Sequence, residues 1–389
     1  MKELPFVDCI ELSGSSVKYF DGTRFFMSTG ALQGCEINED ALEEVTYLDR
    51  PSRANVCVSV GDIIFAKMQN TIKVLRIVED TKDLIVSTGF FVVRPRENID
   101  SEFIVQYLNS GKFNAQKDKN CTGATQKALT NVGLKKITVP ELDYVHQQQI
   151  GMALLKIRTV INKRHEQLAV LDKLARDAFI DMFGNLLTNP LKWQIDDVES
   201  VCSVIVDCPH STPKYLSENT GYYCIKTGDL RGHKINWDMA EFLSEDNYSE
   251  RIRRYKPKYE DVVYSREGAI YGIAAMIDQN YDVALGQRMM LFSVNREKCD
   301  PYFFLYQMNN AFILSQADAC VVGSASPHVN IGSIKKFQFA LPPIERQREF
   351  AEQVKKINKQ KSRLQASLAE LEAIYKSTLQ KAFNGELFQ

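Results

Sequence analysis

Two long stretches of the chain repeat apolar residues at alternating intervals of three and four positions. The first apolar seam consists of Ile150, Leu154, Ile157, Ile161, Leu168 and Leu171. The second seam consists of Phe350, Val354, Ile357, Leu364, Leu368 and Leu371. The mean interval of about 3.5 residues is the repeat of a coiled coil. No Gly or Pro interrupts residues 152–183 or 344–384, so the pattern predicts two long, unbroken helices.

Each apolar seam needs a partner, and the simplest partner is the other helix. The chain order is domain, helix, domain, helix, so the first helix leads away from its domain and the second must return. We therefore expect an antiparallel coiled coil. Pro342-Pro343 precedes the second helix, and Gly184 and Gly385 stand where C-terminal caps belong. Arg164 and Lys361 are polar seam residues that either fix the register or extend to solvent.

Short apolar runs bounded by polar residues, Gly or Pro precede each long helix and predict strands. In the first domain these runs are residues 63–67, 72–77, 89–93 and 137–139. In the second domain they are residues 262–265, 270–276, 289–294 and 337–341. A helical pattern lies between the last two strands of each domain, at residues 101–108 and 301–308. The pattern indicates a mixed α+β domain that occurs twice.

The two halves of the chain match one another in register. The matching segments are 26–32 with 224–230, 61–65 with 260–264, and 90–93 with 289–292. Single residues match as well, among them Gly123 with Gly323 and Phe183 with Phe383. So many matches at nearly one offset indicate a duplicated domain with pseudo-two-fold symmetry. We expect a first domain at residues 1–143, a long helix at 144–186, a second domain at 187–343 and a second long helix at 344–389.

Composition places the chain among soluble globular proteins. Its 389 residues are 44% apolar and 25% charged, enough for more than one core. We expect a cytoplasmic protein without a membrane span, because no long apolar run occurs and Met1 to Pro5 lack a signal-peptide core. Nine cysteines without a Cys-x-x-Cys pair favour reduced thiols. The net charge of −1 hides clusters of Lys and Arg near residues 117–127 and 251–254, which are either solvated surface or local basic patches.

Catalytic motifs are not found in the sequence. Asp300-Pro301-Tyr302-Phe303 is similar to the site of amino-methyltransferases but has one proline too few, and a helix cap followed by Pro explains it. No Gly-rich phosphate loop occurs. A zinc site would have to combine Cys202, Cys208, His210, Cys224 and His233. Their irregular spacing favours buried thiols and ordinary histidines, so we expect no metal, no cofactor and no catalytic residue.

One set of motifs resembles the specificity subunits of type I restriction–modification enzymes. Leu341 to Gln347 opens a helix that ends at Leu379 to Leu387. Trp193, the segment Asp207 to Tyr215 and the segment Glu260 to Ser265 support the resemblance. It covers nearly the whole chain. The first domain departs from the pattern, because it lacks a Trp-led opening and has Glu141-Leu142 in place of the proline pair.

The resemblance implies a non-catalytic subunit with two target recognition domains. Each domain would read one half of a split site in double-stranded DNA. The two helices would space the domains and dock two methyltransferase (modification) subunits, with restriction and translocase subunits joining the complex. A helix of about 40 residues is about 60 Å long at about 1.5 Å per residue. That length bounds the separation of the two half-sites at under about 18 base pairs.

The residues that contact DNA are expected in polar loops, since base edges and phosphates are bound by such side chains. In the first domain the candidates are Arg24, Ser28, Lys67, Gln69, Thr125, Gln126 and Lys127. In the second domain they are His210, Lys214, Lys226, Arg231, Arg266, Gln287, Arg288, Ser326 and His328. The alternative is ordinary turn chemistry at each position.

The sequence is compatible with two other functions. The chain could be a symmetric protein-interaction scaffold that binds no DNA, which a salt-dependent DNA affinity would distinguish. It could also be an enzyme with an unrecognised site, which would show activity in the isolated chain.

Overall fold

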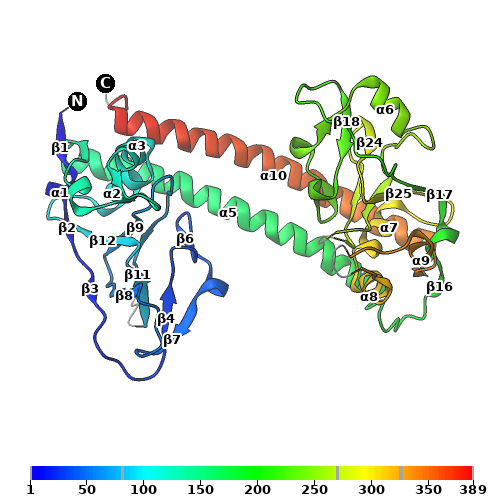
Figure 1. Cartoon of the computed structure of the whole chain (residues 1–389), viewed down its shortest axis with the longest axis horizontal. Helices are drawn as coiled ribbons and strands as arrows, with labels where there is room; N and C mark the ends of the chain where they lie inside the picture. Colours follow the sequence, from blue (N-terminus) through cyan, green and yellow to red (C-terminus); the bar gives the residue numbers. More distant parts are fainter. Residues whose placement is uncertain (1, 80–82, 269–270, 324–326, 388–389) are drawn as a thin grey trace. The chain divides into compact units, whose positions relative to one another are not determined.

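The computed structural model of the chain describes residues 2–79, 83–268, 271–323 and 327–387. The chain folds as two compact units (Figure 1). Unit 1 consists of Met1–Gln167 and Leu364–Gln389, and unit 2 consists of Leu168–Arg363. Each unit therefore contains part of both long helices. No helix in the described ranges is long and apolar enough to cross a membrane.

Unit 1 is built on two β-sheets. The first is antiparallel, has the order β10-β9-β12-β2, and consists of Val74–Arg76, Ile63–Ala66, Phe90–Pro95 and Ile10–Leu12. The second has the order β3-β8-β11-β4-β7 and consists of Ser15–Ser16, Ala54–Cys57, Leu84–Ser87, Arg24–Met27 and Glu43–Val45. In the second sheet β11 runs parallel to β4.

Short elements complete unit 1. Its helices are α1 (Phe6–Cys9), α2 (Ser101–Asn109), α3 (Gly111–Lys119) and α4 (Asn131–Leu134), with a 3-10 turn η1 at Glu39–Ala41. Its two-stranded pairs are β1 (Glu3–Pro5) with β15 (Thr138–Pro140), β5 (Leu32–Gln33) with β6 (Glu36–Ile37), and β13 (Cys121–Thr122) with β14 (Ala128–Leu129).

Unit 2 repeats this plan. Its four-stranded sheet has the order β17-β25-β22-β23 and consists of Cys202–Asp207, Met289–Val294, Val262–Ser265 and Ala274–Met276. Its second sheet has the order β21-β18-β24 and consists of Glu241–Phe242, Tyr222–Ile225 and Asp282–Leu285. Here β18 and β24 are parallel, as β4 and β11 are in unit 1. The predicted duplication is thus confirmed at the level of strand order.

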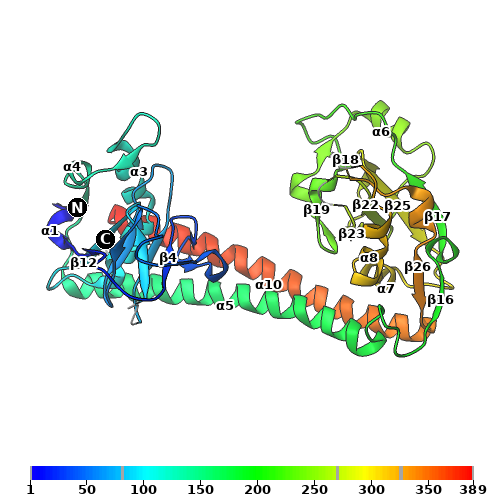
Figure 2. The same ribbon diagram turned by 60° about the horizontal axis from the view of Figure 1, so that its bottom comes forward.

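The remaining elements of unit 2 are short. They are the helices α6 (Glu245–Arg251), α7 (Pro301–Met308), α8 (Ala311–Cys320) and α9 (Ile331–Lys335), and the 3-10 turns η2 (Val198–Val201), η3 (Thr227–Asp229) and η4 (Trp237–Met239). The two-stranded pairs are β16 (Gln194–Asp197) with β26 (Gln338–Leu341) and β19 (Leu230–Arg231) with β20 (Lys234–Ile235). Helix α7 packs against β23, as Figure 2 shows.

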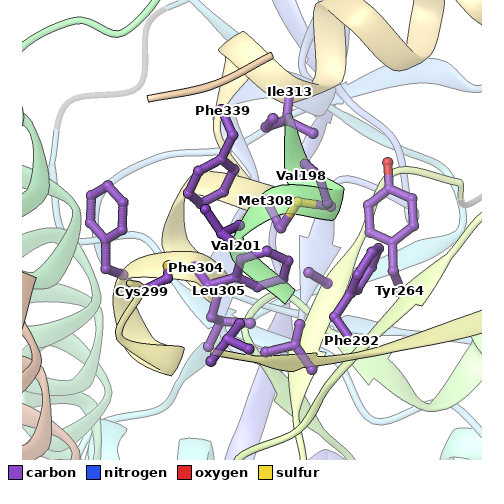
Figure 3. Close-up of a cluster of buried hydrophobic side chains, with 14 of the residues drawn as sticks. Val198, Val201, Tyr264, Phe292, Cys299, Phe304, Leu305, Met308, Ile313 and Phe339 are labelled. Atoms are coloured by element: carbon purple, nitrogen blue, oxygen red, sulfur yellow. The ribbon is translucent and has the colours of Figure 1, made fainter. Parts of the chain in front are cut away.

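The central strands are apolar on both faces, which explains their continuous apolar runs. In β9, Ile63 and Phe65 join a core that contains α2 and α3, whereas Ile64 and Ala66 join a second core against the other sheet. Strand residues alternate between the two faces of a sheet, so a strand covered on both sides is apolar throughout. In β25, Phe292 likewise faces the helical core of unit 2 (Figure 3).

The structure corrects several predicted boundaries. The strand predicted at residues 72–77 spans Val74–Arg76, because Asn70 turns the chain with φ 56°. The strand predicted at 270–276 spans Ala274–Met276, after a turn at Gly272 with φ 85°, and residue 270 lies outside the described residues. The second sheet of each unit and the helices α3 and α8 were not predicted.

The two long helices are α5 (Tyr144–Phe183) and α10 (Ile344–Asn384). In unit 1 the beginning of α5 packs on the end of α10, since Ile150 and Leu154 share a core with Leu379 and Phe383. In unit 2 the end of α5 packs on the beginning of α10, since Phe179 shares a core with Phe350 and Val354. The contacting segments are therefore antiparallel in each unit, as predicted.

The seam residues lie buried or half-buried along both helices. The buried ones are Ile150, Leu154, Ile161, Phe350, Val354, Ile357 and Leu368. The half-buried ones are Ile157, Leu168, Leu171, Leu364 and Leu371. Complete burial of one such side chain stabilises the fold by about 1.5–3 kcal/mol, so both seams contribute substantially.

The two polar seam residues make contacts between the helices. Lys361 forms an ion pair with Asp172 of α5, and its side chain is 12% exposed. Arg164 donates from Nη2 to Ser367 Oγ of α10 at 3.3 Å. These contacts favour the interpretation that both residues help to fix the register rather than only reach solvent.

Candidate nucleic-acid interface

Three loops of unit 2 meet at one edge of its four-stranded sheet. Asp207 ends β17 and pairs with Met290, and Ser265 ends β22 and pairs with Met289 at the start of β25. Because β17 and β22 are both antiparallel to β25, the chain leaves or enters all three strands at the same edge. We call this edge the loop edge of unit 2; it comprises residues 207–213, 265–268, 286–288, 322–323 and 327–328.

Backbone contacts fasten these loops to one another. The N–H of Arg266 donates to the carbonyl of Arg288 at 3.1 Å, and the N–H of Gly268 donates to Pro327 O at 2.8 Å. His328 forms isolated β-bridges with Glu267 and with Val322. Residues separated by more than 100 positions in the sequence therefore form one surface.

Arg266 is the central charge of the loop edge of unit 2. It is 5% exposed, its Nε donates to Asp207 Oδ1 at 3.2 Å, and its Nη1 forms an ion pair with Glu267. His210 Nε2 lies 3.2 Å from the other oxygen of Asp207. A buried guanidinium paired with two carboxylates orients both of them, so Arg266 organises this edge more than it offers free positive charge.

Arg251 fixes the loop that follows β17. It is 7% exposed and donates to the carbonyls of Leu285, Ser211 and Pro209 at 2.9, 3.1 and 3.4 Å. Gln287 adds a hydrogen bond to His210 O at 2.9 Å. Arg251 is not among the predicted DNA contacts, although it lies in one of the basic clusters, because nothing in the sequence indicates that its side chain is buried.

Arg288 is exposed and has a positive φ of 68°. This conformation is uncommon outside Gly, Asn and Asp and costs roughly 1–3 kcal/mol. Such strain persists where neighbouring contacts hold the backbone, and Arg288 O accepts from Arg266 N. The turn thus fixes the backbone from which the exposed Arg288 side chain extends on the loop edge of unit 2.

Unit 1 has an equivalent loop edge, which comprises residues 67–73 and 121–129. Met68 bridges Ala128, as Glu267 bridges His328 in unit 2. The N–H of Gln69 donates to Lys127 O at 3.0 Å, and the N–H of Leu129 donates to Lys67 O at 2.8 Å. The same pairing of loops therefore recurs in both copies.

The cations at the loop edge of unit 1 and in the adjoining helix α3 differ from those of unit 2. Lys67 donates from Nζ to Thr88 O at 2.8 Å and lies over the Phe91 ring. Lys117 is 1% exposed, reaches Thr71 O, and forms an ion pair with Asp118 at 3.6 Å. Burial lowers the pKa of both lysines. Lys117 anchors its loop as Arg251 does in unit 2, from a position that is not equivalent in the repeat.

The structure gathers some of the predicted DNA contacts and separates others. The loop edges contain Lys67, Gln69, Thr125, Gln126, Lys127, His210, Arg266, Gln287, Arg288 and His328. Lys214 is exposed just beyond the loop that follows β17. Ser28, whose Oγ accepts from Ala31 N at 3.3 Å, follows β4. Ser326 lies outside the described residues.

Three further predicted DNA contacts, Arg24, Lys226 and Arg231, make interactions within the protein. Arg24 begins β4, at the opposite end of that strand from Ser28, and lies over the Phe20 ring. Lys226 lies beside Gly286 of the loop edge of unit 2, whose N–H donates to Ile225 O at 2.7 Å, and it forms an ion pair with Glu241 at 2.5 Å. Arg231 of β19 donates to Gly228 O of the 3-10 turn η3 at 2.6 Å. The sequence alone does not distinguish these three residues from the predicted residues on the loop edges, because all of them lie in similar polar segments.

The described residues contain no group of three or more His, Cys, Asp or Glu side chains that could hold a metal ion. Cys202 and Cys208 lie at opposite ends of β17. Burial raises the pKa of the Cys208 thiol and raises that of Cys224 to about 12. These cysteines are therefore protonated thiols near neutral pH.

Comparisons with known proteins agree on one family. Residues 190–373 match the type I restriction modification DNA specificity domain. The type I restriction enzyme MjaVIII specificity subunit of Methanocaldococcus jannaschii is 23% identical over 243 residues, which cover 57% of this chain and 55% of the relative. The putative MjaX specificity subunit of the same organism is 21% identical over 206 residues, which cover 51% and 47%. The chain spans about half the length of the curated relatives it matches.

Two solved structures share the fold along almost the whole chain. The S subunit of a type I restriction–modification system from M. genitalium aligns with 98% of this chain and 96% of its own, with a TM-score of 0.58 and 11% identity. A structure that describes complex assembly and conformational transition of a type I R-M system aligns with 99% and 98%, with a TM-score of 0.56 and 19% identity. The predicted α+β fold with two similar halves and two long helices is confirmed.

Proposed function

We propose that this chain, a member of the specificity-subunit family of type I restriction–modification enzymes, recognises a split site in double-stranded DNA. Each loop edge would contact one half of the site. The observation that carries the proposal is the recurrence of one loop pairing, Met68 with Ala128 and Glu267 with His328. A protein that presents the same kind of surface twice is suited to a target in two parts.

The loop edges carry the chemistry that base reading requires. Gln, His and Arg side chains donate to or accept from base edges, and exposed Arg and Lys bind phosphates. Arg288, Lys214 and Lys127 are exposed cations in these regions. Asp207 and Glu267, which Arg266 orients, are acceptors of the kind that pair with the amino group of cytosine.

The two loop edges share backbone pairing but not side chains. Lys67 stands where Arg266 stands in unit 2, and the buried anchors Lys117 and Arg251 occupy unrelated positions. Different side chains on a common frame would read different base sequences. We therefore propose two unlike half-sites rather than a palindrome.

The long helices would space the recognition domains and recruit partners. In this proposal residues 1–143 and 187–343 are the recognition domains, and residues 144–186 and 344–389 are spacer helices. Helix α5 has 40 residues, about 60 Å at about 1.5 Å per residue. The half-sites would then lie less than about 18 base pairs apart. Exposed side chains on the helices would dock two methyltransferase subunits, which restriction and translocase subunits would join. The chain itself would not be catalytic.

The decisive experiment reconstitutes the chain with a methyltransferase subunit of its own system. Methylation of a random DNA library, followed by sequencing, should return two short motifs separated by a fixed gap. Inserting one or two base pairs into the gap should abolish methylation. Modification of one contiguous motif, without dependence on gap length, would contradict the proposal.

A DNA-independent scaffold is the competing function, and the net charge of −1 and the paired state of Arg266 favour it. A gel-shift titration separates the two functions. Specific DNA affinity that falls steeply with salt supports DNA recognition, whereas its absence in the presence of methyltransferase subunits supports the scaffold.

A further inference from the structure

Unit 2 contains a charged cavity of about 310 Å³, away from its loop edge. Its walls come from α5, α10, α7 and the β19–β20 hairpin. The residues that matter for its chemistry are Asp172, Arg176, His233, Lys234, Tyr306 and Lys361. The volume lies at the lower end of the range for small-molecule sites.

Positive charge exceeds negative charge in the lining, where Arg176, Arg231, Lys234 and Lys361 face the two carboxylates Asp172 and Asp278. Lys361 is paired with Asp172. Arg176 and Lys234 both line the cavity, and neither forms an ion pair with a carboxylate in the described part of the chain. Burial lowers the pKa of Lys234, and the neighbouring charge of Lys361 lowers it further, whereas Asp278 and Asp172 raise it. An anion beside Lys234 would offset its repulsion from Lys361.

One wall of the cavity is flat and aromatic. The His233 ring stacks on Tyr306 with centroids 4.1 Å apart and an interplanar angle of 23°. Burial, with the charges of Lys361 and Arg176, lowers the pKa of His233 to about 4. His233 is therefore neutral near pH 7. It contributes a ring face and a hydrogen-bonding nitrogen there, and no charge.

In unit 1, side chains of the protein itself occupy the region that is equivalent to this cavity. In unit 1 the hydroxyl of Tyr375 donates to Gln106 Oε1 at 2.6 Å. Arg158 and Cys35 lie close enough to affect the pKa of Tyr375. Gln106, Arg158 and Cys35 are the repeat equivalents of Tyr306, Asn358 and His233, all of which line the cavity of unit 2. At the position of Tyr375, unit 2 has only Ala175.

We propose that this cavity of unit 2 binds a small phosphate-bearing anion between Arg176 and Lys234. A guanidinium offers a planar fork of donors to phosphate oxygens, and an ammonium adds a point charge. The bound anion would connect the β19–β20 hairpin with α5, and thereby fasten the recognition domain to the helix pair. This inference does not depend on the proposed DNA function.

Calorimetric titration of the full-length chain tests the proposal. Inorganic phosphate, pyrophosphate and ADP are titrated separately in chloride buffer, and at least one is expected to bind saturably, with one site per chain. Arg176→Met and Lys234→Met should each weaken binding at least tenfold. Lys376→Met is the matched control, because Lys376 is the exposed equivalent of Arg176 in unit 1, and it should bind as the wild type does.

The three probes also identify the source of the phosphate. Tighter binding of ADP than of pyrophosphate indicates a nucleotide, and equal or weaker binding indicates a free phosphate. The proposal is overturned if no probe binds saturably, or if the double variant of Arg176 and Lys234 binds equally well. It is also overturned if a short DNA duplex occupies the site in place of the small anion. Arg176 is exposed on a helix, so Arg176→Met is expected to fold. Its anion affinity therefore tests the proposal even if Lys234→Met fails to fold.

Discussion

Gln347 accepts a hydrogen bond at Oε1 from the backbone N–H of Asp300, at 3.0 Å. Its amide nitrogen donates to Pro342 O at 2.7 Å. Gln147 makes the equivalent bond to the N–H of Asp100, also at 3.0 Å. Both glutamines are at most 4% exposed. Each long helix is thus tied, within its first turns, to the residue that caps the neighbouring helix of the same unit.

Gln347→Leu should destabilise unit 2 by about 1–3 kcal/mol, because it leaves the buried N–H of Asp300 and the carbonyl of Pro342 without partners. Urea unfolding of the full chain measures the change. Arg348→Leu, at an exposed neighbouring position, serves as the control and should stay within about 0.5 kcal/mol of the wild type. Equal stability of Gln347→Leu and wild type would show that the hydrogen bonds contribute nothing.

Arg251→Met should weaken DNA recognition at one half-site only. Without the guanidinium, the carbonyls of Pro209, Ser211 and Leu285 lose their donor, and the loop that carries His210 is released. We expect at least a tenfold loss of affinity for the half-site read by unit 2 and little change at the other. Footprinting of each half-site provides the measurement.

Arg254→Met is the control for that experiment, since Arg254 is exposed in the same basic cluster. Arg251→Lys should retain only part of the affinity, because one ammonium cannot reach the acceptors that the guanidinium fork spans. A uniform loss at both half-sites would instead indicate general destabilisation.

The stability of unit 2 should fall on acidification through His233. Its pKa is lowered from 6.5 to about 4 in the folded protein, so the unfolded chain binds the proton first. The stabilisation is fully present above pH 6.5 and is lost between pH 6.5 and about 4, by on the order of 2–3 kcal/mol. Urea unfolding at pH 7 and pH 4.5 measures the loss.

His233→Phe should flatten this pH dependence, because the ring stays and the titrating group is removed. His165→Phe, at an exposed site on α5, should leave the pH dependence as in the wild type. An unchanged slope in His233→Phe would assign the acid sensitivity to other groups.

Phe183→Ala and Phe383→Ala should each destabilise one unit. Phe183 lies in the core of unit 2, 4.7 Å from the Phe303 ring, and Phe383 lies in the core of unit 1, 5.3 Å from the Phe103 ring. Removing a buried Phe costs about 3–5 kcal/mol. Hydrogen exchange should accelerate in β22 and β25 for the first variant, and in β9 and β12 for the second. The reverse pattern would contradict the core assignments.

The elements with long or continuous apolar patterns were predictable. The seams predicted α5 and α10 because a 3.5-residue repeat over ten turns has no other common structural meaning. Strand β22, Val262–Ser265, was predicted to the residue, because it is apolar on both faces. Strands such as β4, with Arg24 at one end and two buried residues at the other, carry too little pattern to be recognised.

The candidate site was less predictable, because it depends on which loops meet. Arg266 and Arg231 look alike in the sequence, yet one lies buried on the loop edge and the other lines the cavity. The burial of Arg251 and Lys117 follows from contacts between distant segments. Only the offset between the two copies, which pairs Gly123 with Gly323, indicated that a particular loop belonged to a repeated surface.

Phe183 follows the first domain in the sequence but packs in the core of unit 2, and Phe383 follows the second domain but packs in the core of unit 1. This arrangement has a consequence for any attempt to divide the protein. A cut in the segment between Gly184 and Trp193 would yield two fragments, each lacking an aromatic ring that its own core requires and each exposing one that it cannot bury. Neither fragment would be a complete folding unit. Co-expression of the two should restore solubility that separate expression does not give, since folding of each half is completed by sequence encoded in the other.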